Sequence, residues 1–314
     1  MESIRLMPML ERITRGEVLI SDGAMGTYLY AHGLRSRECP ESWCISHPDV
    51  VRGIARAYAS AGSDIVETNS FGGNSFRLAF YHLAGKAREL NRAAAALARE
   101  AVGDRCYVAA SVGPTALAVK GEDGTVSPQQ LYDAFAEQVT ALAEGGADAI
   151  CIETMSSLIE ASQAIRAAKE NTRLPVLCTF NFDATPKGFF TTTGLTPEHA
   201  AKGAAESGAD VVGANCGHGI EMMIPIARRM RAAVPGVPIL IQPNADKPIF
   251  EDGKTIFKAT PQYMASMVEE LIRAGANIIG GCCGTTPEHL TEIAKTARNF
   301  LTMPGHYSKF EATR

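Results

Sequence analysis

Short apolar runs alternate with segments of helical periodicity along almost the whole chain, and this alternation limits the folds open to it. The runs are rich in β-branched residues and end in small or polar residues, which is typical of parallel strands buried on both faces. The eight runs are residues 18–21, 64–66, 107–110, 149–152, 176–180, 211–214, 239–241 and 277–279. Such strand–helix alternation predicts βα units around a parallel sheet.

The same four-residue connection recurs before four of these runs. Its copies are residues 61–64, 145–148, 207–210 and 274–277, and each has glycine in its second position. A glycine there indicates a helix that ends and turns tightly into a strand. Eight strands favour a closed barrel, and no GxGxxG phosphate loop follows the first strand. The predicted fold is therefore α/β, a single (βα)8 TIM barrel.

The chain is long enough for one large barrel. It has 314 residues, of which 46% are hydrophobic, and this supplies ample apolar material for one core. We expect one domain over residues 1–314, with a polar C-terminal tail from about residue 303. Helices are expected at 49–61 and 128–144, the second one capped by Ser127 before a proline. Residues 183–193 are expected to form a long loop after the fifth strand.

Charge and hydropathy exclude several classes of partner. The formal net charge is −4, and no Lys/Arg block indicates binding to nucleic acid or to a membrane surface. No apolar run reaches the roughly 18 residues of a membrane span, and the N-terminus lacks a signal-peptide core. We therefore expect a cytoplasmic protein. In a reducing compartment its eight cysteines are buried small residues, ligands or nucleophiles, and they do not form a disulfide framework.

Chemistry in such barrels lies at the C-terminal ends of the strands. There the sequence places the adjacent pair Cys282 and Cys283, surrounded by glycines, and also Cys216. Neighbouring residues on a regular strand point to opposite faces, but Gly280, Gly281 and Gly284 would let the chain bend so that both sulfurs turn inward.

Three thiolates with an open fourth position fit zinc. The alternative interpretation is that these cysteines are small buried residues at a crowded strand end. A redox pair is disfavoured, because a vicinal disulfide is strained.

A zinc ion held by three thiolates binds a fourth sulfur well, which argues for alkyl transfer to a thiol. The turn at residues 22–26 offers backbone N–H groups for a carboxylate, and Asp22 and Glu153 offer acceptors for an ammonium group. Together these features describe a pocket for an amino acid with a thiol. Other interpretations remain: Asp22 as a turn residue, Glu153 as the partner of a buried Arg or Lys, and Glu67 in either role. His218, two residues after Cys216, could approach the same place.

A set of motifs then matches a known family. The motifs DGAMGT, ETNSFGGN, SVGPT, IET, GANCG, PNADKP and GGCCGTTPEH occur in order between about residues 18 and 297. The set resembles the homocysteine methyltransferase family, which includes the homocysteine module of cobalamin-dependent methionine synthase and betaine–homocysteine methyltransferase. The pair GANC and GGCCG carries most of the specificity.

The resemblance implies a function and a role for each site residue. It implies a (βα)8 barrel with zinc on three cysteines, L-homocysteine bound through its sulfur, and methionine as the product. The implied zinc ligands are Cys216, Cys282 and Cys283. The implied substrate contacts are Asp22 and Glu153 at the amino group and the backbone of Ala24 and Met25 near the carboxylate. We also assign Glu67 and Asn215 to substrate binding.

The methyl donor is open. The motifs are closer to the synthase module, so the expected donor is a methylcobalamin protein, with this chain acting beside a separate corrinoid partner because the sequence ends after the barrel. The alternatives are a small S-methylmethionine or betaine-type donor, or a non-catalytic homocysteine- and zinc-binding subunit of a larger assembly. Two departures from the family affect the rim: Asp246 stands where relatives usually carry glycine, and Gly-His-Gly follows Cys216.

Overall fold

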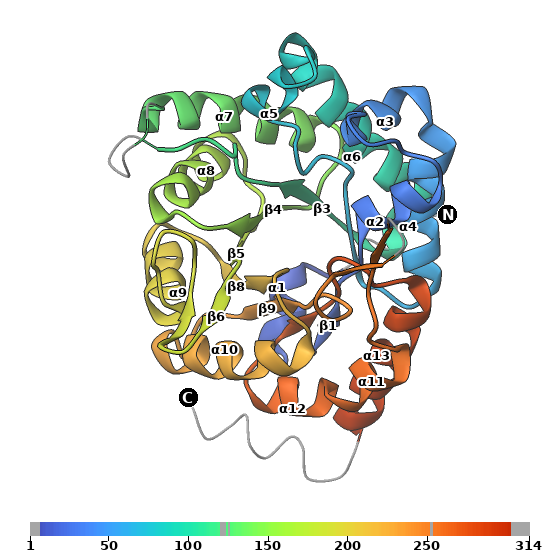
Figure 1. The fold of residues 1–314 in the computed structure, drawn as a ribbon, viewed down its shortest axis with the longest axis vertical. Helices are drawn as coiled ribbons and strands as arrows, with labels where there is room; N and C mark the ends of the chain where they lie inside the picture. The colour runs from blue at the N-terminus through green and yellow to red at the C-terminus, as the bar shows by residue number, and fades with distance from the viewer. Residues whose placement is uncertain (1–6, 120–123, 125, 252–253, 303–314) are drawn as a thin grey trace.

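The predicted barrel is confirmed. The computed structural model describes residues 7–119, 124, 126–251 and 254–302. Eight parallel strands form one sheet in the order β1-β12-β9-β8-β5-β4-β3-β2, and the sheet curls into a ring with helices outside it (Figure 1). The strands are β1 (Leu19–Ile20), β2 (Ile65–Glu67), β3 (Tyr107–Val112), β4 (Ala149–Met155), β5 (Val176–Phe180), β8 (Val211–Asn215), β9 (Ile239–Gln242) and β12 (Ile278–Ile279).

Helices follow the strands and most of them pack around the outside of the ring, while α1 precedes the first strand. They are α1 (Met9–Thr14), α2 (Met25–Ala31), α3 (Trp43–Ser46), α4 (Pro48–Ser60), α5 (Ser75–Ala79), α6 (Ala87–Val102), α7 (Pro128–Glu144), α8 (Leu158–Asn171), α9 (Pro197–Glu206), α10 (Ile220–Ala233), α11 (Pro261–Ser266), α12 (Val268–Arg273) and α13 (Pro287–Thr302). The predicted helix 128–144 coincides with α7. The Ser127 side chain accepts the Gln130 N–H, and the Gln130 side chain accepts the Ser127 N–H, so each caps the other's backbone.

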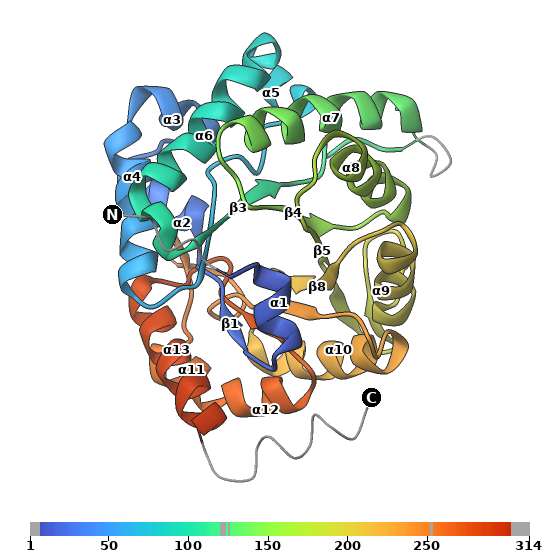
Figure 2. The same ribbon diagram turned by 180° about the vertical axis from the view of Figure 1, so that it is seen from behind.

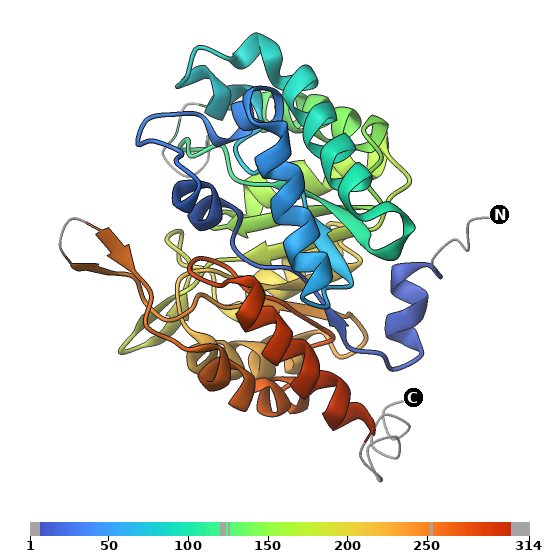
Figure 3. The same cartoon turned by 90° about the vertical axis from the view of Figure 1, so that its right-hand side faces the viewer.

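Two antiparallel hairpins extend the C-terminal end of the barrel, and the sequence indicated neither. The first, β6 (Asp183–Thr185) with β7 (Gly188–Phe190), lies in the segment expected to be a loop. The second is β10 (Ile249–Glu251) with β11 (Lys254–Ile256). Figure 3 shows β10 and β11 projecting from the molecule on the side away from α1.

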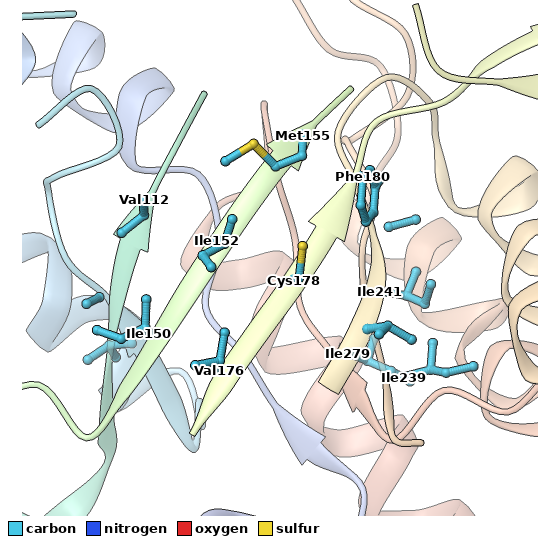
Figure 4. Packing of buried hydrophobic residues seen from close by; sticks show 14 of the residues in the cluster. Val112, Ile150, Ile152, Met155, Val176, Cys178, Phe180, Ile239, Ile241 and Ile279 are labelled. Atoms are coloured by element: carbon cyan, nitrogen blue, oxygen red, sulfur yellow. The ribbon is translucent and has the colours of Figure 1, made fainter. Parts of the chain in front are cut away.

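Apolar side chains fill both sides of the strand ring. Figure 4 shows outward-facing residues such as Ile152, Cys178 and Ile241, which belong to the large cluster between strands and helices. A second cluster fills the interior of the ring and includes Leu177 from β5 and Met9 from α1. Helix α1 lies across the centre of the ring when the barrel is seen from behind (Figure 2). Helix α1 therefore closes the N-terminal end of the barrel.

The repeated four-residue connection forms the same turn four times at that closed end. The glycines have φ values of +103°, +100°, +105° and +109° at Gly62, Gly146, Gly208 and Gly275, a region that favours glycine. The residue two positions after each glycine is Asp64, Asp148, Asp210 or Asn277.

Each of these four side chains accepts the backbone N–H of a residue on the preceding strand, at 2.7–3.0 Å. Each residue also donates its own N–H to that same strand residue. A basic side chain then completes each turn; these are Arg12, Arg99, Lys169 and Arg231. The repeated connection therefore joins the strands in successive pairs, β1 with β2, β3 with β4, β5 with β8 and β9 with β12.

Strands β1 and β2 stand at the two ends of the hydrogen-bonded order, and side chains help to join them. At the N-terminal end, Asp64 donates its N–H to the Ile20 carbonyl at 2.7 Å and accepts the Ile20 N–H on its carboxylate at 2.9 Å. At the other end, the Asp22 carboxylate accepts the Glu67 N–H at 2.8 Å. We call this contact between β1 and β2 the seam.

Within the described ranges, no helix is long and apolar enough to cross a membrane. The polar tail predicted from about residue 303 lies outside the described residues.

Candidate functional site

A cavity of about 420 Å3 opens at the C-terminal end of the barrel, where the strand ends meet. It is lined by the predicted site residues Ala24, Met25, Glu67, Glu153, Cys216, Cys282 and Cys283. The other two predicted residues, Asp22 and Asn215, are buried behind this lining and hydrogen bond to it. The structure therefore brings all the predicted residues to one place, in two layers.

Three sulfur atoms meet at one wall of the cavity. The Sγ of Cys283 lies 4.0 Å from that of Cys216 and 4.0 Å from that of Cys282, and all three lie within 4.8 Å of one another. Tetrahedral thiolates on zinc, with Zn–S bonds of about 2.3 Å, would stand about 3.8 Å apart. The spacing therefore fits one tetrahedral metal ion with a fourth position left over.

The backbone around each cysteine holds its sulfur in this cluster. Cys216 has a φ of +62°, a left-handed conformation that is unusual for a residue with a side chain, and its N–H donates to the Gln242 carbonyl. Thiol hydrogen bonds from Cys282 and Cys283 lower the pKa of Cys216 to about 3. A thiolate at that position is the form that ligates metals.

The glycines around the cysteine pair act partly as predicted. Gly284 has a φ of +81°, and the Phe257 ring packs where its side chain would be. Gly280 and Gly281 have no such conformation; a Cβ at Gly281 would lie 2.4 Å from the Thr285 hydroxyl. At these two positions glycine is required by close approach rather than by backbone conformation. The bend that turns both sulfurs inward is held by the Cys282 N–H to the Pro243 carbonyl and by the Ala245 N–H to the Cys283 carbonyl.

Three carboxyl groups, those of Asp22, Glu67 and Glu153, lie close together, and no described Lys or Arg forms an ion pair with them. Burial raises the pKa of Asp22 to about 8, and burial together with the charge of Asp22 raises the pKa of Glu67 to about 7. Burial and the charge of Glu67 raise the pKa of Glu153 well above its ordinary value. No Lys or Arg forms an ion pair with Glu153 in the part of the chain that the structure describes, so the buried-cation interpretation is wrong there. Such a cluster favours a positively charged ligand.

Glu153 is held in place by its neighbours. Ser111 donates its hydroxyl to one carboxylate oxygen, and Asn215 donates its amide to the other at 3.0 Å. The amide oxygen of Asn215 accepts the N–H of Thr154 and the hydroxyl of Thr179. Thr154 has a φ of +61°, which that contact stabilises. With its polar atoms used in this way, Asn215 positions Glu153.

Of the two backbone groups at the start of α2 that were predicted to bind a carboxylate, those of Ala24 and Met25, one is already hydrogen bonded. Ala24 donates its N–H to the Thr285 hydroxyl at 3.1 Å, so that group is already engaged. The Tyr58 hydroxyl donates to the Ala24 carbonyl and fixes the same turn from behind. Met25 begins α2, which has no side-chain cap, and it belongs to the lining of the cavity. Met25 is therefore the better placed of the two for a carboxylate.

His218 and Asp246 lie outside this cavity's lining. The Nε2 of His218 accepts the Ala184 N–H at 3.0 Å, and the imidazole is 3% exposed. Asp246 has a φ of +77°, a left-handed conformation that favours glycine.

Sequence reasoning missed several residues that shape the site, namely Ser111, Thr285, Tyr58 and Gln242. Gln242 donates to the Glu67 carboxylate at 3.0 Å. Ser111 is the next-to-last residue of β3, Gln242 is the last residue of β9, and Thr285 follows the cysteine pair. A rule that takes the last polar residue of every strand would have found Ser111 and Gln242. Tyr58 lies in the last turn of α4, and no sequence signal marks it.

The comparison with protein families decides the identity of the chain. The model described as homocysteine S-methyltransferase matches residues 19–297. This chain belongs to the homocysteine S-methyltransferase family. The predicted resemblance is therefore confirmed, and so is the enzyme class, a methyltransferase.

Relatives of known identity include large enzymes. The chain is 31% identical over 306 residues to methionine synthase of Mycobacterium tuberculosis, a match that covers 90% of this chain and 25% of the relative. It is 32% identical over 298 residues to methionine synthase of Mycobacterium leprae, covering 88% and 24%. The chain thus spans about a quarter of the length of these curated relatives.

Solved structures of methyltransferases share the barrel. The homocysteine methyltransferase MmuM from Escherichia coli, in its metallated form, matches with a TM-score of 0.75 and 20% identity, covering 92% of this chain and 99% of MmuM. A methyltransferase from Methanosarcina mazei matches with a TM-score of 0.60 and 10% identity, covering 93% and 98%. At these identities the likeness concerns the fold.

Proposed function

We propose that this chain transfers a methyl group to the thiol of L-homocysteine and forms methionine, with zinc held by Cys216, Cys282 and Cys283. The observation that carries the proposal is the 4.0 Å spacing of three sulfurs on the wall of a cavity that also holds carboxyl groups without cations. When bound, zinc would supply a site at which the substrate thiol loses its proton at neutral pH. The chain then needs no general base for that proton.

The remaining polar groups fit the amino-acid part of homocysteine. One oxygen of Asp22 accepts the Glu67 N–H, while the other has no partner among the described residues although it is buried. An ammonium group beside Asp22, Glu67 and Glu153 would supply the missing charge and donors, and would stabilise their ionised forms. We assign the carboxylate of homocysteine to the backbone of Met25, at the start of α2.

Binding the amino-acid end at the carboxyl groups leaves the thiol to extend toward the three sulfurs. Asn215 and Ser111 fix the Glu153 carboxylate, and this limits the orientations open to the ammonium group. Holding the acceptor in one orientation lowers the entropic part of the barrier to methyl transfer. Two anchors, one at each end of homocysteine, also account for two kinds of group in one cavity, the carboxyl groups and the thiols.

For the donor, we propose a methylcobalamin protein. The support is the 31% identity with a methionine synthase, of which this chain matches about a quarter. One observation favours the small-molecule alternative, an S-methylmethionine or betaine-type donor. The same cavity is lined by Tyr30, Tyr81, Phe71 and the buried Glu41, and a cation already lies over one of these rings, since the Arg77 guanidinium is 5.7 Å from the centre of the Phe71 ring. Aromatic faces with a carboxylate suit a methyl-bearing cation.

The test measures methionine formed by the zinc-loaded protein from homocysteine with three donors in parallel: methylcobalamin, S-methylmethionine and betaine. Turnover with methylcobalamin, followed by the loss of its absorption spectrum, would support the proposed donor. Turnover with a small onium donor alone would replace the corrinoid by the alternative. Zinc and homocysteine binding without turnover from any donor would make the chain a non-catalytic binding subunit.

The cysteine pair offers a matched control for the metal. Cys283→Ala should lose zinc and turnover. Cys178→Ala, which removes a buried thiol from β5 away from the cavity, should keep both. Zinc retained with full activity in Cys283→Ala would refute the assignment of the metal ligands.

A further inference from the structure

The loop at residues 68–74, between β2 and α5, forms one side of the homocysteine cavity. The residues of this loop that line the cavity are Thr68, Asn69, Ser70, Phe71 and Gly72. Thr68 and Ser70 are buried, so their polar atoms need partners within the protein. These partners connect the loop to Ser111, whose hydroxyl donates to Glu153.

Thr68, Ser70 and Ser111 form a closed cycle of three hydrogen bonds. The Ser111 N–H donates to the Thr68 hydroxyl oxygen at 3.0 Å, and the Ser70 hydroxyl donates to the Ser111 carbonyl at 2.7 Å. The two hydroxyl oxygens lie 2.5 Å apart. Because the Ser70 proton is used on the Ser111 carbonyl, the Thr68 hydroxyl is the donor between them. The loop therefore holds both backbone groups of Ser111.

Two helices hold this loop from outside the ring of strands (Figure 1). Gln138 of α7 is fully buried, and its Nε2 donates to the Ser70 carbonyl at 2.8 Å. The same Nε2 donates to the Asn91 Oδ1 of α6 at 3.3 Å, and the Asn91 amide donates to the Gly73 carbonyl at 2.7 Å. Two buried amides therefore fix the backbone of the loop at two points.

Gln138 is a costly residue at its position on α7. Its buried neighbours on that helix include Leu131, Phe135 and Leu142. Burial of an amide among apolar side chains costs free energy unless its hydrogen bonds are made, and the Gln138 Oε1 has no partner among the described residues. An apolar side chain would avoid that cost. What Gln138 supplies in return is the donor that holds the Ser70 carbonyl.

We propose that Gln138 is a positioning residue for the ammonium group of homocysteine, acting through Ser70 and Ser111 on the Glu153 carboxylate. The connection runs from the Gln138 amide to the Ser70 carbonyl, from the Ser70 hydroxyl to the Ser111 carbonyl, and from the Ser111 hydroxyl to Glu153. Gln138 does not line the cavity, so it acts on the ligand only through these residues. The inference rests on the proposed binding of homocysteine.

Calorimetry on the zinc-loaded full chain tests the inference with two thiols, homocysteine and 4-mercaptobutanoate, which is homocysteine without its amino group. Gln138→Met keeps the length of the side chain but removes the donor. It should weaken the binding of homocysteine roughly threefold, the effect of one neutral hydrogen bond, and leave the binding of 4-mercaptobutanoate unchanged. Gln163→Met makes the same change in α8, and as the matched control it should leave both affinities unchanged.

A double variant gives a second readout, which loss of structure alone would not produce. Once Ser111→Ala has removed the hydroxyl beside Glu153, Gln138 has no group left to position there. The double variant should therefore bind homocysteine as weakly as Ser111→Ala does, instead of losing affinity twice. The KM for homocysteine should follow the same pattern, while the KM for the methyl donor stays the same in Gln138→Met.

Three results would overturn the inference: an unchanged affinity of Gln138→Met for homocysteine, an equal loss for both thiols, or additive losses in the double variant. If Gln138→Met does not fold, Ser70→Ala replaces it with the same expectations, because it removes the hydroxyl in the middle of the connection. Failure of the unchanged chain to bind homocysteine would refute the proposed function, and the inference with it.

Discussion

At the N-terminal end of the barrel, Asp64, Asp148, Asp210 and Asn277 each bond to a neighbouring strand and to a basic side chain. At the C-terminal end, buried atoms of Asp22, Asn181, His218, Gln242 and Asn244 have no hydrogen-bond partner among the described residues. Buried polar groups are normally paired, so unpaired groups gathered at one end indicate a place that a ligand completes. The comparison shows a barrel in which one end serves stability and the other binding.

The largest expected effect lies at the C-terminal end. Replacing Cys283 by alanine removes one of three sulfurs and should lower methyl transfer more than about 100-fold, because first ligands matter at least as much as the groups behind them. The free energy of unfolding of the metal-free protein should hardly change. Metal analysis, initial rates and urea unfolding measure the three quantities. A metal-free variant that is several kcal/mol less stable would contradict the view that the C-terminal end of the barrel serves binding rather than stability.

The opposite result is expected at the N-terminal end. Asp148→Ala leaves the Val108 N–H without its acceptor and Arg99 without its partner. It should lower the free energy of unfolding by about 2–3 kcal/mol, while the rate per folded molecule stays unchanged. Urea unfolding measures the first and methionine formation the second. Asp104→Ala, an exposed aspartate in the short 3-10 helix Gly103–Arg105, is the control and should be neutral.

Asp22→Asn should make the metal-free protein more stable and weaken its binding of homocysteine. The folded-state pKa of Asp22 is about 8 against an ordinary 3.8, so the folded state holds the proton more tightly. Stability is therefore fully present below about pH 4 and falls as the pH rises toward 8.

An asparagine cannot ionise, and the metal-free variant should be more stable than the unchanged chain by about 1–2 kcal/mol at pH 8, with a flatter dependence on pH. Thermal or urea unfolding at pH 5 and pH 8 measures this. A variant that is less stable at pH 8 would show that Asp22 serves the seam more than the ligand.

The smallest effect concerns a supporting residue. Ser111→Ala removes one hydroxyl that donates to Glu153 and should raise the KM for homocysteine roughly threefold to tenfold, with zinc content and kcat nearly unchanged. Ser162→Ala in α8 deletes the same group outside the barrel and should leave KM as it is. A fall in kcat alone would mean that Ser111 acts on the transfer step.

The sequence predicted the barrel well because each signal was local. All eight apolar runs became strands within a few residues, and the Gly-containing connection predicted four turns that proved alike in backbone conformation. The sequence did not reveal that these turns pair the strands through Asp or Asn, because that contact joins residues about 35–45 positions apart.

The site was predicted in its residues more than in their roles. Cys216, Cys282 and Cys283 could be named from composition and motif, and their sulfurs do come together. Asn215 shows the limit, since its position at a strand end suggested ligand binding while its amide is used on Glu153, Thr154 and Thr179. Which partner a buried amide takes depends on packing from three strands, and no single segment encodes it.

The seam gives the barrel a property that a complete ladder of strand pairs would not have. Hydrogen bonds between backbone groups of neighbouring strands do not involve the side chains of the site, but the contact between β1 and β2 depends at its C-terminal end on the Asp22 carboxylate, which is buried behind the lining of the cavity. A cation bound beside the Asp22 carboxylate would weaken the hydrogen bond that this carboxylate accepts from the Glu67 N–H. Ligand binding would therefore affect the contact between β1 and β2. We therefore expect ligand binding in the cavity to change the hydrogen-exchange rate of the Glu67 amide, so that this one amide reports whether the site is occupied.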